Sequence, residues 1–252
     1  MIKDWFFSLL TLVVFGLTFA YYDVKGRLAL RRGPEAFDRT MATLQRKLIE
    51  SFRISGVSVT IEGAEQVADG TAFIFVSNHQ SMFDVPIFGG LLTGKFPKYV
   101  AKASLAKGIP AVSLNLRRGG NALIDRGDRA QAIEAIAEMG RTCEERQVSA
   151  VIFPEGTRSR DGSVGEYRIG GLETLMQSAP AMPVVPTAID GSWKVFQNNM
   201  FPIPYGTPVR VRIGAPIERS PDEDPTAILA ACRAHAVETL AEWASTAPDT
   251  LR

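Results

Sequence analysis

The sequence has few of the residue types from which covalent frameworks and metal sites are built. Two cysteines occur among its 252 residues, and Cys143 and Cys232 fit no C-x-x-C spacing. This pattern argues against a disulfide framework and against a zinc site, and it favours a reducing compartment. Histidine is equally scarce, with His79 and His235 the only two. We therefore expect no bound metal and ask what each histidine does.

A surplus of charge of one sign is missing as well. The chain carries 28 Lys and Arg against 27 Asp and Glu, and this balance gives no case for nucleic-acid binding. A nucleophile elbow of the form G-x-S-x-G is also missing, so the sequence offers no obvious protein nucleophile. The length is enough for one domain with a full core, or for a domain with an appendage.

The N-terminus carries a long hydrophobic run. No charged side chain occurs from Trp5 to Tyr22, and aromatic residues stand at both ends. A helix needs roughly 20 apolar residues to cross a bilayer, and aromatic ends are typical of its interfaces. Lys25, Arg27, Arg31 and Arg32 follow the run, which predicts that the rest of the chain lies on the cytoplasmic side of the membrane.

We therefore expect residues 1–24 to form a membrane anchor helix. A cleaved signal peptide is an alternative, because "TFA" near residue 20 resembles a cleavage site. The missing positive n-region and the long apolar run argue against it. A helix that lies in the membrane surface is a further alternative.

Residues 25–55 are expected to form a juxtamembrane amphipathic helix. Between positions 36 and 52, apolar side chains recur at steps of three and four, which is typical of one helix face: Phe37, Met41, Leu44, Leu48, Ile49 and Phe52. This face suits a lipid surface, and it equally suits packing on the core of a domain.

Residues 56–252 are expected to form the main domain. Short runs typical of strands occur at 57–61, 71–77, 150–153, 184–189 and 209–213, and helical patterns occur at 82–92, 128–146 and 224–243. Strands that alternate with helices predict an α/β fold with a mostly parallel central sheet flanked by helices. Ligands of such sheets bind beyond the carboxyl ends of the strands.

His79 lies at one of these strand ends, in the stretch "NHQSMFD". Asp84 is expected in or near the first turn of the following helix, from which its carboxylate can reach back to the imidazole. An acid bound to one ring nitrogen fixes the tautomer and leaves the other nitrogen as a base. A histidine that only caps the helix is the structural alternative. His235 is expected at the surface of the C-terminal helix.

The stretch "FPEGTRS" follows another expected strand. Gly156 allows close approach of the backbone to a ligand, Thr157 offers a hydroxyl, and Arg158 offers a guanidinium that suits phosphate. Glu155 is placed to orient Arg158. A plain turn with a surface arginine is the alternative. Arg126 in "LIDR" and Lys102 in "YVAKASL" are further candidates for phosphate binding, or for solvated cations.

Together these stretches resemble the 1-acyl-glycerol-3-phosphate acyltransferases of the glycerolipid acyltransferase family. "NHQSMFD" is similar to the first motif of that family, "LIDR" to the second, "FPEGTRS" to the third and "MPVVPTAI" to the fourth. The resemblance covers residues 56–214, and four motifs in order at suitable spacing are specific. The sequence departs from the family pattern at three places. "YRIGG" has the single cation Arg168 where the family often has two lysines, and "IPAVSLNLRRGG" lacks the usual aromatic–glycine pair. The second motif has Leu123 where phenylalanine is common.

The resemblance implies a membrane enzyme of phospholipid biosynthesis. His79, oriented by Asp84, would deprotonate the sn-2 hydroxyl of a lysophosphatidic acid, and the oxygen would attack the thioester of acyl-CoA or acyl carrier protein. Arg158, with Gly156, Thr157 and Arg126, would hold the phosphate of the acceptor. No metal or cofactor is implied; the acyl thioester is a co-substrate.

Other readings stay open at this point. The departures leave room for another acceptor, such as a lyso-ornithine lipid, and a CoA-independent transacylase would use the same fold. If the chain were a non-catalytic lipid-binding protein, we would expect the base or its acid to be lost, yet His79 and Asp84 are both present. A phosphatase or hydrolase would need metal ligands or a nucleophile elbow.

Overall fold

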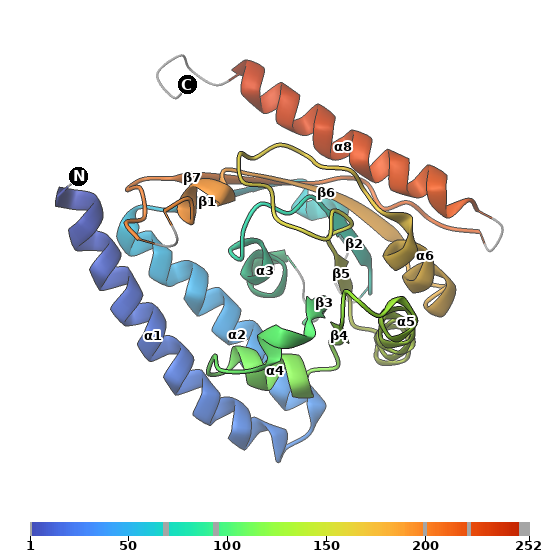
Figure 1. The fold of residues 1–252 in the computed structure, drawn as a ribbon, viewed down its shortest axis with the longest axis horizontal. Coiled ribbons are helices and arrows are strands. Elements are labelled where there is room, and N and C mark those ends of the chain that lie inside the picture. Colours follow the sequence, from blue (N-terminus) through green and yellow to red (C-terminus); the bar gives the residue numbers. More distant parts are fainter. Residues whose placement is uncertain (1, 68–70, 93–95, 199–200, 221–222, 247–252) are drawn as a thin grey trace.

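The protein is described by a computed structural model that covers residues 2–67, 71–92, 96–198, 201–220 and 223–246. A central sheet lies between two layers of helices (Figure 1). The helices α1 (Ile2–Leu30), α2 (Pro34–Phe52), α3 (Asp84–Ile87) and α4 (Val112–Arg118) lie to one side of it. Helices α5 (Arg129–Arg146), α6 (Ile169–Ser178) and α8 (Pro225–Thr246) pack on its other face.

Within the part of the chain that the structure describes, the sheet has seven strands in the order β1-β7-β6-β2-β5-β3-β4. They are β1 (Ser58–Glu62), β2 (Ile74–Ser77), β3 (Lys98–Lys102), β4 (Ala122–Ile124), β5 (Ala150–Ile152), β6 (Val184–Asp190) and β7 (Pro208–Ile213). All neighbours pair in parallel except β6 and β7. The expected mostly parallel α/β fold is therefore confirmed, with β1 and β7 running opposite to the other strands.

Two strands were missing from the sequence-based prediction. Strand β3 begins and ends with lysine, and β4 is a short run flanked by polar residues, so neither has the apolar pattern expected of a strand. Both are nevertheless held in the sheet, since Lys98 and Tyr99 pair with β5 while Val100 to Lys102 pair with β4.

Alternate residues of the buried strands serve two separate cores, as the period of two of a strand requires. Phe75 and Val151 point towards α2 and α3, whereas Ile74 and Ile152 point towards α5, α6 and α8. Strands buried on both faces read as continuous apolar runs, which is why β2, β5 and β6 were recognisable in the sequence.

Helix α2 packs on the domain with the face that the sequence left open to lipid or core. The six apolar residues named above for this face are at most 6% exposed and join the core cluster that includes Phe75 and Val151. Packing on the core is therefore the outcome for this helix. An ion triad adds to the contact, because the buried Asp38 of α2 accepts from the buried Lys98 of β3 and from the partly exposed Arg146 of α5, each at 2.7 Å.

Helix α1 lies beside α2 rather than standing apart from the domain (Figure 1). It continues past the expected boundary at residue 24 to Leu30, and α2 begins at Pro34. The two helices come close at Gly26, where a Cβ would lie 2.9 Å from the Met41 side chain. By length and composition, α1 is able to cross a bilayer.

The helix expected at 82–92 is divided into two parts. A short α-helical turn, α3, is followed by a π-helical turn, Phe88–Leu92. This turn lies directly on α2, since a Cβ at Gly90 would lie 2.7 Å from the Arg46 backbone nitrogen. The expectation that His235 is a surface residue was wrong: the ring is half-buried against β7, with Nε2 3.4 Å from the Arg212 carbonyl oxygen. Burial lowers the pKa of His235.

Candidate functional site

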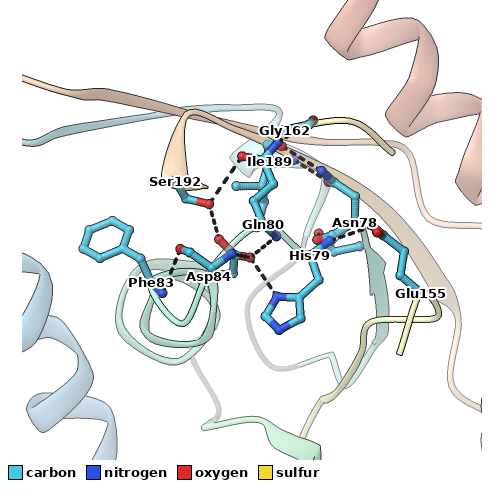
Figure 2. A network of polar contacts seen from close by, with 11 residues as sticks. Asn78, His79, Gln80, Phe83, Asp84, Glu155, Gly162, Ile189 and Ser192 are labelled. Atoms are coloured by element: carbon cyan, nitrogen blue, oxygen red, sulfur yellow. Dashed lines mark hydrogen bonds and ion pairs between the residues drawn. The ribbon is translucent and has the colours of Figure 1, made fainter. Parts of the chain in front are cut away.

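His79 and Asp84 form a hydrogen-bonded pair at the carboxyl end of β2 (Figure 2). The strand ends at Ser77, the chain turns at His79, and Asp84 is the first residue of α3. The Nδ1 atom of His79 lies 2.8 Å from Oδ2 of Asp84. The ring is accessible, with 17% of the side chain exposed, whereas the aspartate is fully buried. Nε2 has no hydrogen-bond partner among the residues that the structure describes.

The Asp84 carboxylate is fixed by three further donors. Oδ2 also accepts from the backbone N–H groups of Gln80, at 2.7 Å, and Ser81, at 2.9 Å. Oδ1 accepts from the hydroxyl of Ser192, which follows β6. An acceptor-only group with this many donors suits an ionised carboxylate, and a carboxylate partner makes Nδ1 the protonated nitrogen of the ring.

The loop after β5 holds the backbone of His79 from the other side. The His79 N–H donates to Oε1 of Glu155 at 2.9 Å, and the His79 carbonyl accepts from the Ser159 N–H at 2.8 Å. The imidazole also stacks on Phe153, with ring centroids 4.1 Å apart and an interplanar angle of 19°. Residues of the first and third motifs therefore form one structural unit around the imidazole.

Glu155 has a different position from the one expected. Its carboxylate is 6% exposed and bonds the backbone of His79 and Gly165, so it aligns two loops rather than orienting Arg158. Burial raises the pKa of Glu155, and the hydrogen bonds from these two backbone groups oppose the increase. Its contact with the peptide N–H of His79 places Glu155 directly behind the candidate base.

The expected phosphate-binding residues lie along the same edge of the sheet. Gly156, Thr157 and Arg158 are exposed in the loop after β5, Lys102 ends β3, and Arg126 follows β4. In the sheet order β2-β5-β3-β4 these segments are successive neighbours of the strand that leads to His79. The structure thus places three exposed cations, Arg158, Lys102 and Arg126, at the carboxyl ends of the strands, on the same side of the sheet as the imidazole.

Arg168, the lone cation of "YRIGG", also belongs to this region. Its Nη1 atom would lie 3.9 Å from a Cβ at Gly156, and its backbone N–H donates to the Pro154 carbonyl. The guanidinium therefore lies beside the glycine turn of the third motif, which makes it a fourth candidate for binding an anion.

Sequence reasoning missed three residues of the polar network (Figure 2). Asn78 is fully buried and joins β2 to β6 by two hydrogen bonds with Ile189, each at 2.8 Å. Gln80 donates to the Gly162 carbonyl at 3.0 Å. Ser192 bonds Asp84. The signal for Asn78 and Gln80 was their place in the first motif, whereas no local pattern indicated Ser192.

Among the residues that the structure describes, the candidate base has no activated side-chain nucleophile beside it. The Ser81 hydroxyl is 3% exposed and accepts from the Phe83 N–H, so it stabilises the turn into α3. An imidazole held at Nδ1 by a carboxylate has the geometry of a general base, which can take a proton from a hydroxyl at Nε2. This arrangement suits transfer of a group to an alcohol.

Comparison with known proteins identifies the class. A family model described as acyltransferase matches residues 58–190, more than half of the chain. The chain belongs to this acyltransferase family, as its motifs predicted. The matched range begins at β1, ends with β6 and contains both elements of the His79–Asp84 pair.

Individual relatives share one name. A 1-acyl-sn-glycerol-3-phosphate acyltransferase from Cocos nucifera is 29% identical over 165 residues, which are 66% of this chain and 51% of that protein. The 1-acyl-sn-glycerol-3-phosphate acyltransferase alpha of Homo sapiens is 28% identical over 146 residues, 58% of this chain and 51% of that protein. The match thus spans about half the length of these curated relatives.

A solved structure shares the fold over nearly the whole chain. The crystal structure of the 1-acyl-sn-glycerophosphate acyltransferase PlsC from Thermotoga maritima superposes with a TM-score of 0.75. It is 24% identical and covers 96% of this chain and 97% of its own. The likeness therefore includes the N-terminal helices as well as the sheet.

Proposed function

We propose that the protein transfers a fatty acyl group from a thioester of coenzyme A or acyl carrier protein to the sn-2 hydroxyl of a 1-acyl-glycerol-3-phosphate, giving phosphatidic acid. The observation that carries this proposal is the His79–Asp84 pair, 2.8 Å apart, on a sheet edge with exposed cations. The shared name of the relatives supports the acceptor.

The chemistry follows from the two ring nitrogens of His79. Nδ1–H donates to Asp84, so Nε2 is free to take the proton of the acceptor hydroxyl as its oxygen attacks the thioester carbonyl. The tetrahedral intermediate then collapses, the C–S bond breaks, and the imidazolium returns the proton to the departing thiolate. The acidic partner stabilises the positive charge that the ring carries between these two steps.

The exposed cations supply the acceptor site. A phosphate monoester carries close to two negative charges at neutral pH, and arginine forks match its oxygens in pairs. Arg158, with Gly156 and Thr157, is proposed to bind this phosphate, with Arg126, Lys102 and Arg168 nearby. No cofactor is needed in this scheme.

We further propose that α1 lies in the plane of the cytoplasmic membrane surface. Its inward face carries Ser8, Thr11 and Gly26 beside core-packed aromatic residues, whereas the outward face is apolar between charged residues near the two ends. Its large apolar side chains that are at least 44% exposed are Ile2, Trp5, Phe6, Leu9, Leu10, Val13, Leu17, Tyr21, Val24 and Leu28. The surface helix of a water-soluble domain has charged and polar residues on its outward face instead.

Hydrogen bonds near both ends of α1 support this in-plane placement. The Ser8 hydroxyl accepts from the Ile203 N–H at 2.8 Å, Thr11 bonds Ser55 at 2.7 Å, and Asp23 accepts from the Ala111 N–H at 2.8 Å. A helix held to the domain in this way presents its side to lipid rather than its end.

The function is tested with purified protein, radiolabelled acyl-CoA or acyl carrier protein, and a panel of lysolipids. The panel contains lysophosphatidic acid, lysophosphatidylcholine and lyso-ornithine lipid, and a parallel reaction omits the thioester. We expect labelled phosphatidic acid from lysophosphatidic acid alone, and none with His79→Ala. Product formed without thioester would indicate a transacylase, and turnover by His79→Ala would refute the assigned base.

A further inference from the structure

A short segment between β3 and α4, residues 103–110, exposes apolar side chains that the proposed reaction does not use. Leu105 is 44% exposed and Ile109 is 38% exposed, whereas Ala106 between them is buried. Large apolar side chains that remain exposed close together in the chain are typical of a surface that contacts another apolar phase. The segment therefore needs an explanation of its own.

The charge around this segment is of one sign. No aspartate or glutamate occurs between residues 85 and 124, a range that contains both β3 and α4. The exposed cations among its described residues are Lys102, Lys107, Arg117 and Arg118. Lys102, Lys107 and Arg118 form no ion pair with any residue that the structure describes. Apolar side chains among free cations favour an anionic lipid surface, which binds both.

Hydrogen bonds fix the segment beside α1 and α4. Arg117 Nη1 donates to the Ala106 carbonyl at 3.0 Å, so α4 holds the middle of the segment. The Ala111 N–H, which follows the segment, donates to Oδ1 of Asp23 on α1 at 2.8 Å. Figure 1 shows α4 and the preceding loop between α1 and the β3–β4 side of the sheet. The exposed side chains thus belong to a loop that is anchored at two points.

The contact point on α1 lies at the border of the face that is proposed to meet lipid. Tyr22 and Gly26 are buried against the domain, whereas Val24 and Leu28 are exposed. Asp23, with 17% of its side chain exposed, stands between these two faces, because successive positions of an α-helix are about 100° apart around its axis. The segment therefore adjoins the outward face of α1 rather than lying behind the helix.

A second lipid contact would settle an orientation that α1 leaves open. A single helix in a membrane surface allows the domain to roll about the helix axis, and a contact beside that axis removes this freedom. We propose that residues 103–110 are this contact, with Leu105 and Ile109 inserted into an anionic bilayer surface and Lys107 among the headgroups. The inference rests on the proposed placement of α1. Because the segment begins directly after the carboxyl end of β3, the contact would turn the strand ends that carry His79 towards the lipid.

The experiment places a fluorescent reporter on the segment. Leu105→Cys in the full chain is labelled with the polarity-sensitive dye nitrobenzoxadiazole. The native Cys143 and Cys232 are fully buried, so the introduced thiol takes the label. The protein is mixed with vesicles of phosphatidylcholine and phosphatidylglycerol in equal parts. We expect the emission to shift to shorter wavelength and to be quenched by lipid that carries a doxyl group on its acyl chain. Ile109→Cys should respond in the same way.

Matched positions separate this contact from the rest of the molecule. Ile133→Cys on α5 and Val237→Cys on α8, whose parent side chains are 43% and 40% exposed, should show neither effect. Leu17→Cys reports on the outward face of α1. A response at Leu17→Cys without one at Leu105→Cys would overturn the role of the segment and leave the placement of α1 intact. An equal response at all positions would indicate non-specific adsorption and would also overturn it. Since no turnover is measured, failure here leaves the proposed reaction untouched.

The composition of the vesicles tests the charge. Lys107→Gln should weaken binding to the mixed vesicles about 5-fold, whereas Arg141→Gln, an exposed cation on α5, should leave binding unchanged. Vesicles of phosphatidylcholine alone should give a weaker response, and an equal response would overturn the anionic part of the proposal. A shift caused by an acidic acyl carrier protein in the absence of vesicles would assign the segment to the donor and overturn the lipid assignment.

Discussion

The hydroxyl of Ser192 donates to Oδ1 of Asp84, although 108 positions separate the two residues in the sequence. Both side chains are fully buried, and the contact joins the turn after β6 to the first residue of α3. The acid that orients the candidate base is therefore itself oriented by a part of the chain outside the first motif.

Replacement of Ser192 should affect kcat rather than substrate affinity. Ser192→Ala leaves one oxygen of the Asp84 carboxylate without its donor, and the loss of such a bond costs about 1.5–3 kcal/mol. We expect kcat to fall roughly 10-fold with both KM values unchanged, and the downfield proton resonance of His79 Nδ1–H to move. Ser163→Ala, which removes an exposed hydroxyl bonded to Asp161, is the matched control. An unchanged kcat would exclude a positioning role.

Asp84→Asn should be far more damaging. An amide in place of the carboxylate removes the charge that stabilises the imidazolium, and its NH₂ group favours the wrong tautomer of His79. Turnover should fall roughly 10³–10⁴-fold. Circular dichroism and acceptor binding, measured alongside, should stay close to wild type. Residual activity near one tenth would show that the pair is structural.

Arg158→Ala should weaken the acceptor more than the reaction. The loss of a paired guanidinium–phosphate contact is expected to raise the KM for lysophosphatidic acid roughly 10-fold or more, with kcat little changed. Arg160→Ala alters an exposed arginine of the same loop and serves as control. An equal effect from both substitutions would point to general surface charge, and the phosphate would then be reassigned.

The buried Glu155 predicts a particular dependence of stability on pH. Burial raises its pKa in the folded protein, so the folded state binds the proton more tightly than the unfolded chain does. Its contribution to stability is therefore fully present below the unfolded pKa, about 4.3, and is lost as pH rises through the folded pKa. Glu155→Gln removes this titration. The Tm of the variant minus that of wild type should increase from about pH 4 to pH 7; a flat difference would contradict the assignment.

The outward face of α1 can be tested by vesicle sedimentation. The double variant Leu9→Glu with Leu17→Glu puts two charges on this face. Each leucine would otherwise gain about 1.5–3 kcal/mol on burial in lipid, so binding of the protein to vesicles should fall more than 10-fold. The Tm should stay unchanged, because both side chains point away from the domain. Ile133→Glu with Val237→Glu, exposed apolar positions on α5 and α8, is the matched control. If both pairs reduce binding equally, the α1 face is not the membrane contact.

The fold class was predictable because the central strands are buried on both faces. Strands β2, β5 and β6 read as apolar runs, and α5 and α8 as helical patterns, within a few residues of their observed bounds. Strands β3 and β4 could not be predicted from the sequence. Their place in the sheet depends on long-range pairs such as Lys98 with Ala150, and on the ion pair that Lys98 forms with Asp38. A single sequence does not display such partners.

The site divides in the same way. The approach of His79 to Asp84 follows from local chain geometry, since a strand end and a helix start leave the two side chains within reach. The position of Glu155 was misjudged because its partner is the backbone of His79, 76 positions away, rather than the neighbouring Arg158. Ser192 has no motif, and only the meeting of β6 with β2 brings it to Asp84.

The close packing of α1 on the domain bears on any attempt to obtain a shorter, water-soluble form of the protein. Deletion of residues 2–30 would remove the hydrogen-bond partners of Ser55, Ile203 and Ala111 and would uncover one side of Phe52, which contacts Phe15 edge to face. The truncated protein would then expose a hydrophobic surface that α1 normally covers. Removal of the lipid-facing helix should thus yield aggregation rather than solubility.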